Sequence, residues 1–339
     1  MKKSNLLQKH GYTAMLLALM VVVILFFTIA KGSMLWQSNV WLGMTMQFPE
    51  YGVIALGMMF CFICGKMDLS VVALGDFATI MAVQYMGSHA VDGMSDAQVG
   101  GVILVGILIA LAIAAFGGLI NGLLVSGLDV PPVMATIAMQ LCWSGLSIAL
   151  TRGDTVKGLP ALYTGIGHKY LFGFLPVPLL IFIVIFALCA FLLRCTVYGE
   201  KLYMVGTNIK AAKFSAINTN RMIIGTYILC DVICCIGCLI MISTMASAKA
   251  DYGTSYLMRC ILILVLAGVL PDGGMGKIAN VLVAIVTIQI IATGVNMFSN
   301  LNTYYSSLIW GALLLIVLIM STKMEGGFLK LKKSARSKN

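Results

Sequence analysis

The chain has 339 residues, of which 60% are hydrophobic and only 10% are charged, and its mean hydropathy is +1.02. So few polar side chains cannot cover the surface of a soluble globule of this size, which excludes a soluble globular protein and indicates one that lipid solvates. The net charge of +10 does not indicate a nucleic-acid partner, because the basic residues lie in short tails and loops instead of forming one stripe.

Ten apolar runs are long enough to cross a hydrocarbon core about 30 Å thick. The first follows Lys2, Lys3 and Lys9, as in a signal peptide, but it is long enough to span and many runs follow it, so we expect it to be retained. The sequence therefore predicts an all-α integral membrane protein with about ten transmembrane helices. In chain order the runs cover 12–30, 48–65, 69–86, 99–126, 133–150, 175–194, 222–243, 257–271, 278–297 and 305–321.

The basic residues also predict the orientation, because Lys and Arg are retained on the cytoplasmic side of short loops. An even number of spans puts both termini on one side, and both tails, 1–11 and 322–339, are basic. With the tails inside, the inward segments carry 16 of the 22 basic residues and the outward segments carry six. We therefore expect cytoplasmic termini on either side of a transmembrane domain at 12–321.

Two connecting segments are long enough to contact a partner, and this topology places them on opposite faces. The outward segment, 151–174, mixes glycine, polar and aromatic residues, which suits either a contact with a soluble partner or an ordinary solvated connector. The inward segment, 195–221, contains a predicted short helix from Ile209 to Ile217. Ala212 and Ala216 would lie one turn apart on it, a small face that another protein could approach closely; the alternative is a plain basic loop.

The sequence contains no recognisable catalytic motif, since the three histidines are scattered and no nucleophile is paired with a base. The segment 273–277, GGMGK, imitates a phosphate-binding loop, but Pro271 and Ile278 stand where that motif needs Gly and Ser or Thr. We therefore expect no catalytic residue and no ATP site of this kind.

The ten cysteines lie mostly inside apolar runs. Cys230, Cys234 and Cys238 recur at every fourth residue, so they share one helix face. With no histidine near them, we interpret them as small core residues and expect no metal site.

Ionisable residues at membrane depth are functional candidates because burying a charge is costly. Asp76 and Asp231 could serve proton coupling, but two isolated carboxylates without a basic partner make a poor relay. Asp68 begins a span within GKMDLS, where it can cap free backbone N–H groups or contact a ligand. Further uncharged polar residues lie within the fourth and ninth runs, where they can hydrogen-bond sugar hydroxyls or join helices: Asn121, Gln289, Thr293 and Asn296.

Four segments resemble motifs of one known family, the permeases of ribose-type and other simple-sugar ABC importers. GKMDLSVVALGDF is similar to the family's Gly-Ile-Asp-Leu-Ser-Val-Gly segment, and GGLINGLLVSGLDVPPVMATIAM is similar to its Gly-x-x-Asn-Gly-x-Leu-Val to Pro-Pro stretch. VGTNIKAAKFSAIN is similar to its cytoplasmic Gly-x-Asn-x-x-Ala-Ala-x-x-Ser-Gly-Ile motif, and LAGVLPDGGMGKI to its Gly-Gly-x-Gly turn. Order and spacing also agree, and the resemblance covers most of the chain from about 50 to 320.

This resemblance implies an ABC importer permease fold in a bacterial plasma (inner) membrane, and a transport subunit that is not an enzyme and holds no cofactor. It implies three partners: a cytoplasmic ABC ATPase that binds the ATP, an external sugar-binding protein, and a second permease copy, identical or a close paralogue. It also places the ATPase contact in the inward loop, at Gly206, Asn208, Lys210, Ala211, Ala212, Ser215 and Ile217.

The sequence thus favours a translocation path for a simple sugar such as a pentose or hexose. A branched-chain amino-acid permease and an ion-coupled secondary transporter remain as alternatives; a zwitterionic substrate would need charged or helix-end contacts in the path. The candidate path residues are Asp68, Ser70, Asn121, Gln289 and Asn296.

Overall fold

The computed structural model describes residues 2–90, 93–171, 173, 175–298, 308, 310–312 and 315, with side chains described from residue 12 onward. The described part is a helical bundle with one two-stranded antiparallel hairpin, in which Tyr170 lies opposite Pro176. In chain order the elements are α1 (Lys2–Lys31), η1 (Gly32–Trp36), α2 (Ser38–Ile63), α3 (Val71–His89), α4 (Asp96–Ser126), α5 (Pro132–Thr151), α6 (Ala161–His168), β1 (Tyr170–Leu171), β2 (Leu175–Pro176), α7 (Val177–Cys195), α8 (Val197–Thr207), α9 (Ile209–Phe214), α10 (Thr219–Met245), α11 (Thr254–Leu266) and α12 (Ile278–Asn296).

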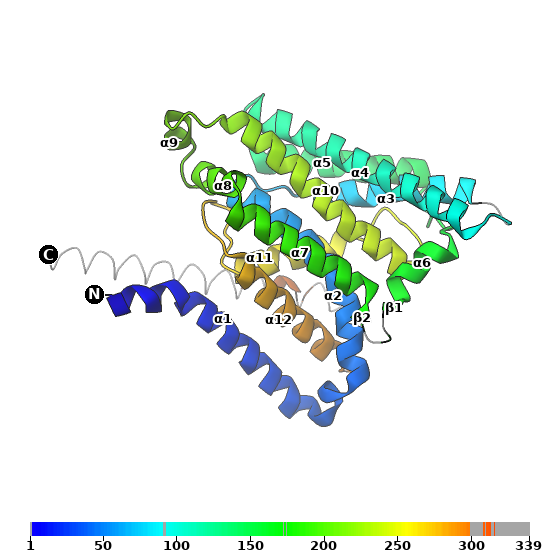
Figure 1. Ribbon diagram of the computed structural model, residues 1–339, viewed down its shortest axis with the longest axis horizontal. Coiled ribbons are helices and arrows are strands. Elements are labelled where there is room, and N and C mark those ends of the chain that lie inside the picture. Colours follow the sequence, from blue (N-terminus) through cyan, green and yellow to red (C-terminus); the bar gives the residue numbers. More distant parts are fainter. Residues whose placement is uncertain are drawn as a thin grey trace.

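Helices α2 and α10 run through the middle of the bundle, and their inward residues form the largest apolar core. Figure 1 shows α3, α4 and α5 on one side of this pair and α1 and α12 on the other. The start of α1 lies at the same end of the bundle as α8 and α9, and the opposite end carries α6 with the β1–β2 hairpin (Figure 1). We call these the α9 end and the α6 end.

Eight helices of the described part are long and apolar enough to cross a membrane: α1, α2, α3, α4, α5, α7, α10 and α12. They match eight of the ten predicted runs and confirm the all-α membrane class. The run predicted at 257–271 corresponds to α11, whose 13 residues extend only about 20 Å and cannot cross a bilayer alone. The run at 305–321 and the tail at 322–339 lie outside the described residues, apart from five positions in the run.

Helix α2 differs most from its predicted bounds, because it begins at Ser38 and not near residue 48. Its first turns contain Asn39, Thr45 and Gln47, which lower the hydropathy and hide the helix from a search for apolar runs. The helix continues through Pro49, and its last fifteen residues are buried from Pro49 to Ile63. A polar first half on a buried helix indicates a surface that faces something other than lipid.

Glycines let α10 approach its neighbours at backbone distance. A Cβ added at Gly118 of α4 would lie 2.7 Å from the Ile228 Cα of α10, and one at Gly57 of α2 would lie 2.6 Å from the Cys234 Sγ. Such small residues are the usual means of close helix packing in membranes. Cys230, Cys234 and Cys238 are free and buried on this face, and the described residues contain no group of three or more His, Cys, Asp or Glu side chains that could hold a metal ion.

The described residues of the connection 151–174 pack against the α6 end of α10. Val156 forms an antiparallel bridge with Ala248, the Tyr163 hydroxyl donates to the Leu239 carbonyl at 2.8 Å, and the Ser243 hydroxyl donates to the Tyr163 carbonyl at 2.8 Å. These bonds tie α6 to α10, so this segment forms a built cap on the bundle.

The α4–α10 contact predicts opposite effects for two Gly→Ala changes. Gly118→Ala should lower the stability of the permease by about 1–3 kcal/mol, because its methyl group would meet the α10 backbone. Gly225→Ala on α10 has nothing within 4 Å of the added Cβ and should be neutral or stabilising by up to about 1 kcal/mol. Thermal unfolding of the two variants in detergent measures this, and equal melting temperatures would contradict the packing.

Candidate functional site

The break between α2 and α3 holds a buried polar network. Asp68 Oδ1 accepts hydrogen bonds from the Ser70 backbone N–H at 2.8 Å and from the Ser70 hydroxyl at 2.7 Å. Its Oδ2 accepts from the Asn121 side-chain amide of α4 at 2.9 Å, and the same amide donates to Ser70 Oγ at 2.8 Å. Asp68 therefore accepts from the backbone N–H of Ser70, the residue before α3, and not from an N–H of the first helical turn. Through Asn121 it joins the start of α3 to α4.

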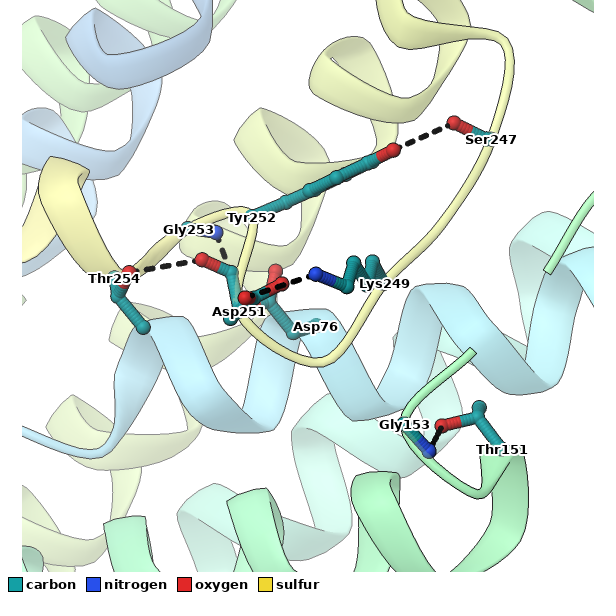
Figure 2. Close-up of polar contacts among 9 residues, drawn as sticks. All are labelled: Asp76, Thr151, Gly153, Ser247, Lys249, Asp251, Tyr252, Gly253 and Thr254. Atoms are coloured by element: carbon teal, nitrogen blue, oxygen red, sulfur yellow. Dashed lines mark hydrogen bonds and ion pairs between the residues drawn. The ribbon is translucent and has the colours of Figure 1, made fainter. Parts of the chain in front are cut away.

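Asp76 of α3 holds the loop between α10 and α11. The Gly253 N–H donates to Asp76 Oδ2 at 3.2 Å, and Figure 2 shows this carboxylate directed at the loop from the α3 ribbon. Within the loop, Lys249 pairs with Asp251 at 3.1 Å. No basic side chain in the described part forms an ion pair with Asp76 or Asp231, which leaves both without the partner of a proton relay.

Gln289 joins α12 to α2. Its Oε1 accepts from the Tyr51 hydroxyl, and its amide donates to Gln47 Oε1 at 3.1 Å and to Thr293 Oγ1 at 3.0 Å. Asn296, two turns further on, lines a cavity of about 270 Å³ that Gln47 and Thr293 also line. The predicted path residues thus fall into two separate groups, one at the α2–α3 break and one between α2 and α12.

A larger cavity, which we call the α2 cavity, lies beside the second group. It has a volume of about 390 Å³, within the range of small-molecule sites, and it shares Gly43 and Gln47 with the smaller one. Its walls come from α2, α6, α10 and α11. The lining residues are Gly43, Met46, Gln47, Glu50, Tyr51, Gly167, His168, Thr244, Met245, Tyr256 and Arg259.

Glu50 and Arg259 are the charged members of this lining. Glu50 is 5% exposed, and its two oxygens accept hydrogen bonds from the Thr244 hydroxyl at 2.5 Å and the Tyr256 hydroxyl at 2.6 Å. The Arg259 guanidinium lies over the rings of Tyr51 and Tyr256, at 5.1 and 5.6 Å, and over Trp310 at 4.7 Å. Cation–π contacts of this kind stabilise a desolvated guanidinium.

Neither of these charged residues is among the predicted path residues. Glu50 lies within the predicted run at 48–65, and Arg259 lies within the run at 257–271. One carboxylate and one guanidinium inside two predicted spans is a signal that could have been read, since charges within spans mark functional sites.

The inward loop forms α8 and α9, and α9 is shorter than predicted. Asn208 Oδ1 accepts from the Ala211 N–H at 3.1 Å and starts the helix, which ends at Phe214 and not at Ile217. Ala216 is in the left-handed region with φ of 58°, so it does not share a helical face with Ala212. The prediction of a small face formed by these two alanines was therefore wrong.

The exposed surface of α9 is of a different kind. Phe214 is 93% exposed, whereas Ala212 is buried. Lys210, Lys213 and Ser215 are exposed. A groove of about 320 Å³ lies beside the helix, lined by Tyr203, Met204, Thr207, Asn208, Ala211, Ala212 and Ser215.

Gly206 of α8 packs within the chain, in what we call the glycine junction with Ile63 and Gly274. A Cβ at Gly206 would lie 1.8 Å from the Ile63 carbonyl oxygen and 2.6 Å from the Gly274 nitrogen, and the Gly274 N–H donates to that carbonyl at 2.7 Å. The Tyr203 hydroxyl donates to the Gly276 carbonyl at 2.8 Å. Burial raises the pKa of the Tyr203 phenol above its ordinary value, so this donor stays protonated at neutral pH.

Within the described residues, eight helices long and apolar enough to span and a cavity lined by polar side chains are typical of a multi-pass membrane transport protein. A family model described as the permease component of the branched-chain amino acid transport system matches residues 40–318, so the chain belongs to this family.

Curated relatives are similar over nearly the whole chain. The autoinducer 2 import system permease protein LsrD of Yersinia pseudotuberculosis serotype O:1b (strain IP 31758) is 29% identical over 322 residues, which are 93% of this chain and 92% of that protein. The protein of the same name from Yersinia pestis (strain Pestoides F) gives the same values. No solved structure matches the chain. The prediction of an importer permease is confirmed at the level of this family.

The hydrogen bonds of Asn121 predict a stability effect that tells whether this residue joins helices or lines the translocation path. Asn121→Leu should destabilise the permease by about 1–3 kcal/mol, because the buried Asp68 Oδ2 loses its donor. Asn220→Leu, at an exposed position of α10, is the matched control and should change little. Unfolding in detergent measures both. An Asn121→Leu protein of unchanged stability that has lost transport would instead place Asn121 in the path.

Proposed function

We propose that this chain is the permease subunit of an ATP-binding-cassette importer, and that it forms the translocation path for a simple sugar or a related hydroxylated molecule. The observation that carries this is similarity over 93% of the chain to proteins named as import system permeases. ATP is bound and hydrolysed in a separate subunit. A second permease copy, identical or a close paralogue, completes the membrane part.

The α9 end faces the cytoplasm in this proposal. Its support is the distribution of basic residues, of which 16 fall on the segments expected inside and six on those expected outside. The start of α1 and the α8–α9 segment share that end (Figure 1), as the predicted topology requires. The α6 end then faces outward, where an external sugar-binding protein would meet the cap formed by 151–174.

The ATPase docks on α9. Its exposed Phe214 supplies an aromatic anchor of the type that dominates interfaces, and the groove beside Asn208, Ala211 and Ser215 can accept a partner side chain. Lys210 remains a contact residue. The other three predicted contact residues support α9 instead of touching the ATPase. Gly206 forms the glycine junction, Ala212 is buried and Ile217 is half-buried.

Branched-chain amino acids are the second candidate cargo. Two observations favour them: the description of the family model, and the presence of both Glu50 and Arg259 in the α2 cavity, which could meet an ammonium and a carboxylate. We prefer a neutral hydroxylated cargo because the rest of the polar lining consists of amide, hydroxyl and imidazole groups, and because Glu50 already accepts two hydroxyl donors.

Reconstitution tests the function directly. Proteoliposomes with this permease, its ATPase and its binding protein should take up a labelled pentose or hexose only when ATP is supplied on the ATPase side. Dissipating the proton gradient should leave the rate unchanged, since Asp76 and Asp231 lack basic partners in the described part. Uptake that follows the gradient without ATP would overturn the importer assignment, and uptake of leucine in place of sugars would assign the amino-acid cargo.

Phe214 provides the test of the docking surface. Phe214→Ala should lower both sugar uptake and substrate-stimulated ATP hydrolysis about tenfold or more, because truncating a central aromatic anchor weakens an interface by about 2 kcal/mol. The control is Phe191→Ala on α7, which is 56% exposed on a membrane span and should leave coupling unchanged. Normal coupled activity in Phe214→Ala would remove α9 from the ATPase contact.

A further inference from the structure

The α2 cavity is built from side chains that oppose one another across the bundle. Glu50 comes from α2, Thr244 from α10, and Tyr256 and Arg259 from α11. Glu50 and Arg259 form no ion pair within 4 Å in the described part, so the two charged side chains lie apart in the cavity wall. These side chains join the helices, but they also line an open cavity, and convergent polar groups in a cavity point to a ligand.

Glu50 is prepared for hydroxyl donors. Each of its oxygens accepts one neutral O–H, from Thr244 and from Tyr256. A carboxylate offers about four lone-pair positions, so each oxygen can accept a second hydrogen bond. Two neighbouring hydroxyls of a sugar can each donate to one of the two carboxylate oxygens of Glu50. They are O–H donors of the same kind as the hydroxyls of Thr244 and Tyr256.

Arg259 offers the complementary donors. Three aromatic rings lie against its guanidinium, and its Nε is buried without a hydrogen-bond partner in the described part. The guanidinium lines the cavity and carries N–H donors but no acceptor, so it favours an acceptor oxygen of a ligand. Gln47, whose side chain is exposed and lines both cavities, adds an amide with both a donor and an acceptor.

These contacts favour a neutral polyol over a zwitterion. A zwitterion would form two charge pairs with Glu50 and Arg259, which are strong hydrogen bonds when water is excluded. A transported molecule must bind weakly enough to leave. Hydroxyl contacts to the same groups orient the molecule and leave its net charge unchanged.

We propose that the α2 cavity is the site at which the permease holds its cargo, with Glu50 accepting hydrogen bonds from two adjacent hydroxyls of a neutral sugar and Arg259 and Gln47 contacting its other oxygens. This inference rests on the proposed function and specifies where and how that function recognises its substrate.

The test combines a change of the Glu50 carboxylate with the removal of single hydroxyls from the sugar. Uptake is measured in proteoliposomes holding the complete importer with saturating binding protein, for the transported sugar and for its series of monodeoxy analogues, with unsubstituted permease and with Glu50→Gln. The binding protein is the same in both arms, so its own preference cancels when the ratio of analogue to parent uptake is compared between arms. Groups in contact give non-additive losses.

Glu50→Gln should slow uptake of the parent sugar about tenfold or more. For at least one deoxy analogue, the ratio of analogue to parent uptake should rise about threefold or more in the variant. The carboxylate that bonds this hydroxyl is already absent from the variant, so removing the hydroxyl from the sugar costs less uptake there. Asp96→Asn, the matched carboxyl-to-amide change at an exposed residue of α4, should leave every ratio unchanged. If Glu50→Gln does not assemble, the same comparison with Tyr256→Phe should show a ratio change for an analogue.

Three results would overturn the proposed site. The first is an analogue-to-parent uptake ratio in the assembled Glu50→Gln variant that equals the ratio in the unsubstituted permease for every analogue. The second is an uptake rate of the parent sugar that Glu50→Gln does not change, and the third is inhibition of sugar uptake by leucine that Glu50→Gln abolishes. Absence of any ATP-dependent sugar uptake by the unsubstituted importer would instead count against the proposed function, so the two failures are distinguishable.

Discussion

Polar groups inside an apolar bundle must find partners within the protein, and this constraint fixes the place and rotation of α2. Glu50 is bonded by Thr244 of α10 and Tyr256 of α11, while Tyr51 is bonded to Gln289 of α12. Apolar packing alone selects helix rotation weakly in a membrane. A shift of α2 by one residue would turn these side chains by about 100° and break all three bonds, so α10, α11 and α12 are arranged around the polar half of α2.

The same helix ends in the glycine junction. The Ile63 carbonyl accepts from the Gly274 N–H at 2.7 Å, and Gly206 of α8 approaches it so closely that a Cβ would not fit. α2 has 26 residues and is therefore about 39 Å long. In the proposed importer, a displacement of α8 at the α9 end would therefore be passed to the Ile63 end of α2 and, along this helix, to the wall of the α2 cavity. The proposed docking surface and the proposed cargo site would then be coupled through one helix.

Much of the fold could be predicted from hydropathy, because helices with little buried surface, such as α4 and α7, are apolar over most of their length. The predicted starts of two further helices also lie close to the observed ones, which are Val71 for α3 and Ile209 for α9. The start of α2 and the short α11 could not be predicted in this way, since a helix buried in protein needs no apolar surface toward lipid. The Glu50–Tyr256 bond joins residues 206 positions apart, and no local pattern encodes such a pairing.

Arg259 is the residue of the α2 cavity that bears most directly on its proposed function. A guanidinium at membrane depth costs several kcal/mol unless its charge is compensated, and three aromatic rings return about 0.5–2 kcal/mol each. Arg259 is half-buried and forms no ion pair with Glu50 in the described part, so its place in the lining is not explained by a salt bridge between the two. The compensation is incomplete because its Nε has no partner in the described part of the chain. In the proposed cargo site, the N–H groups of this side chain that face the cavity would donate to oxygens of the transported molecule.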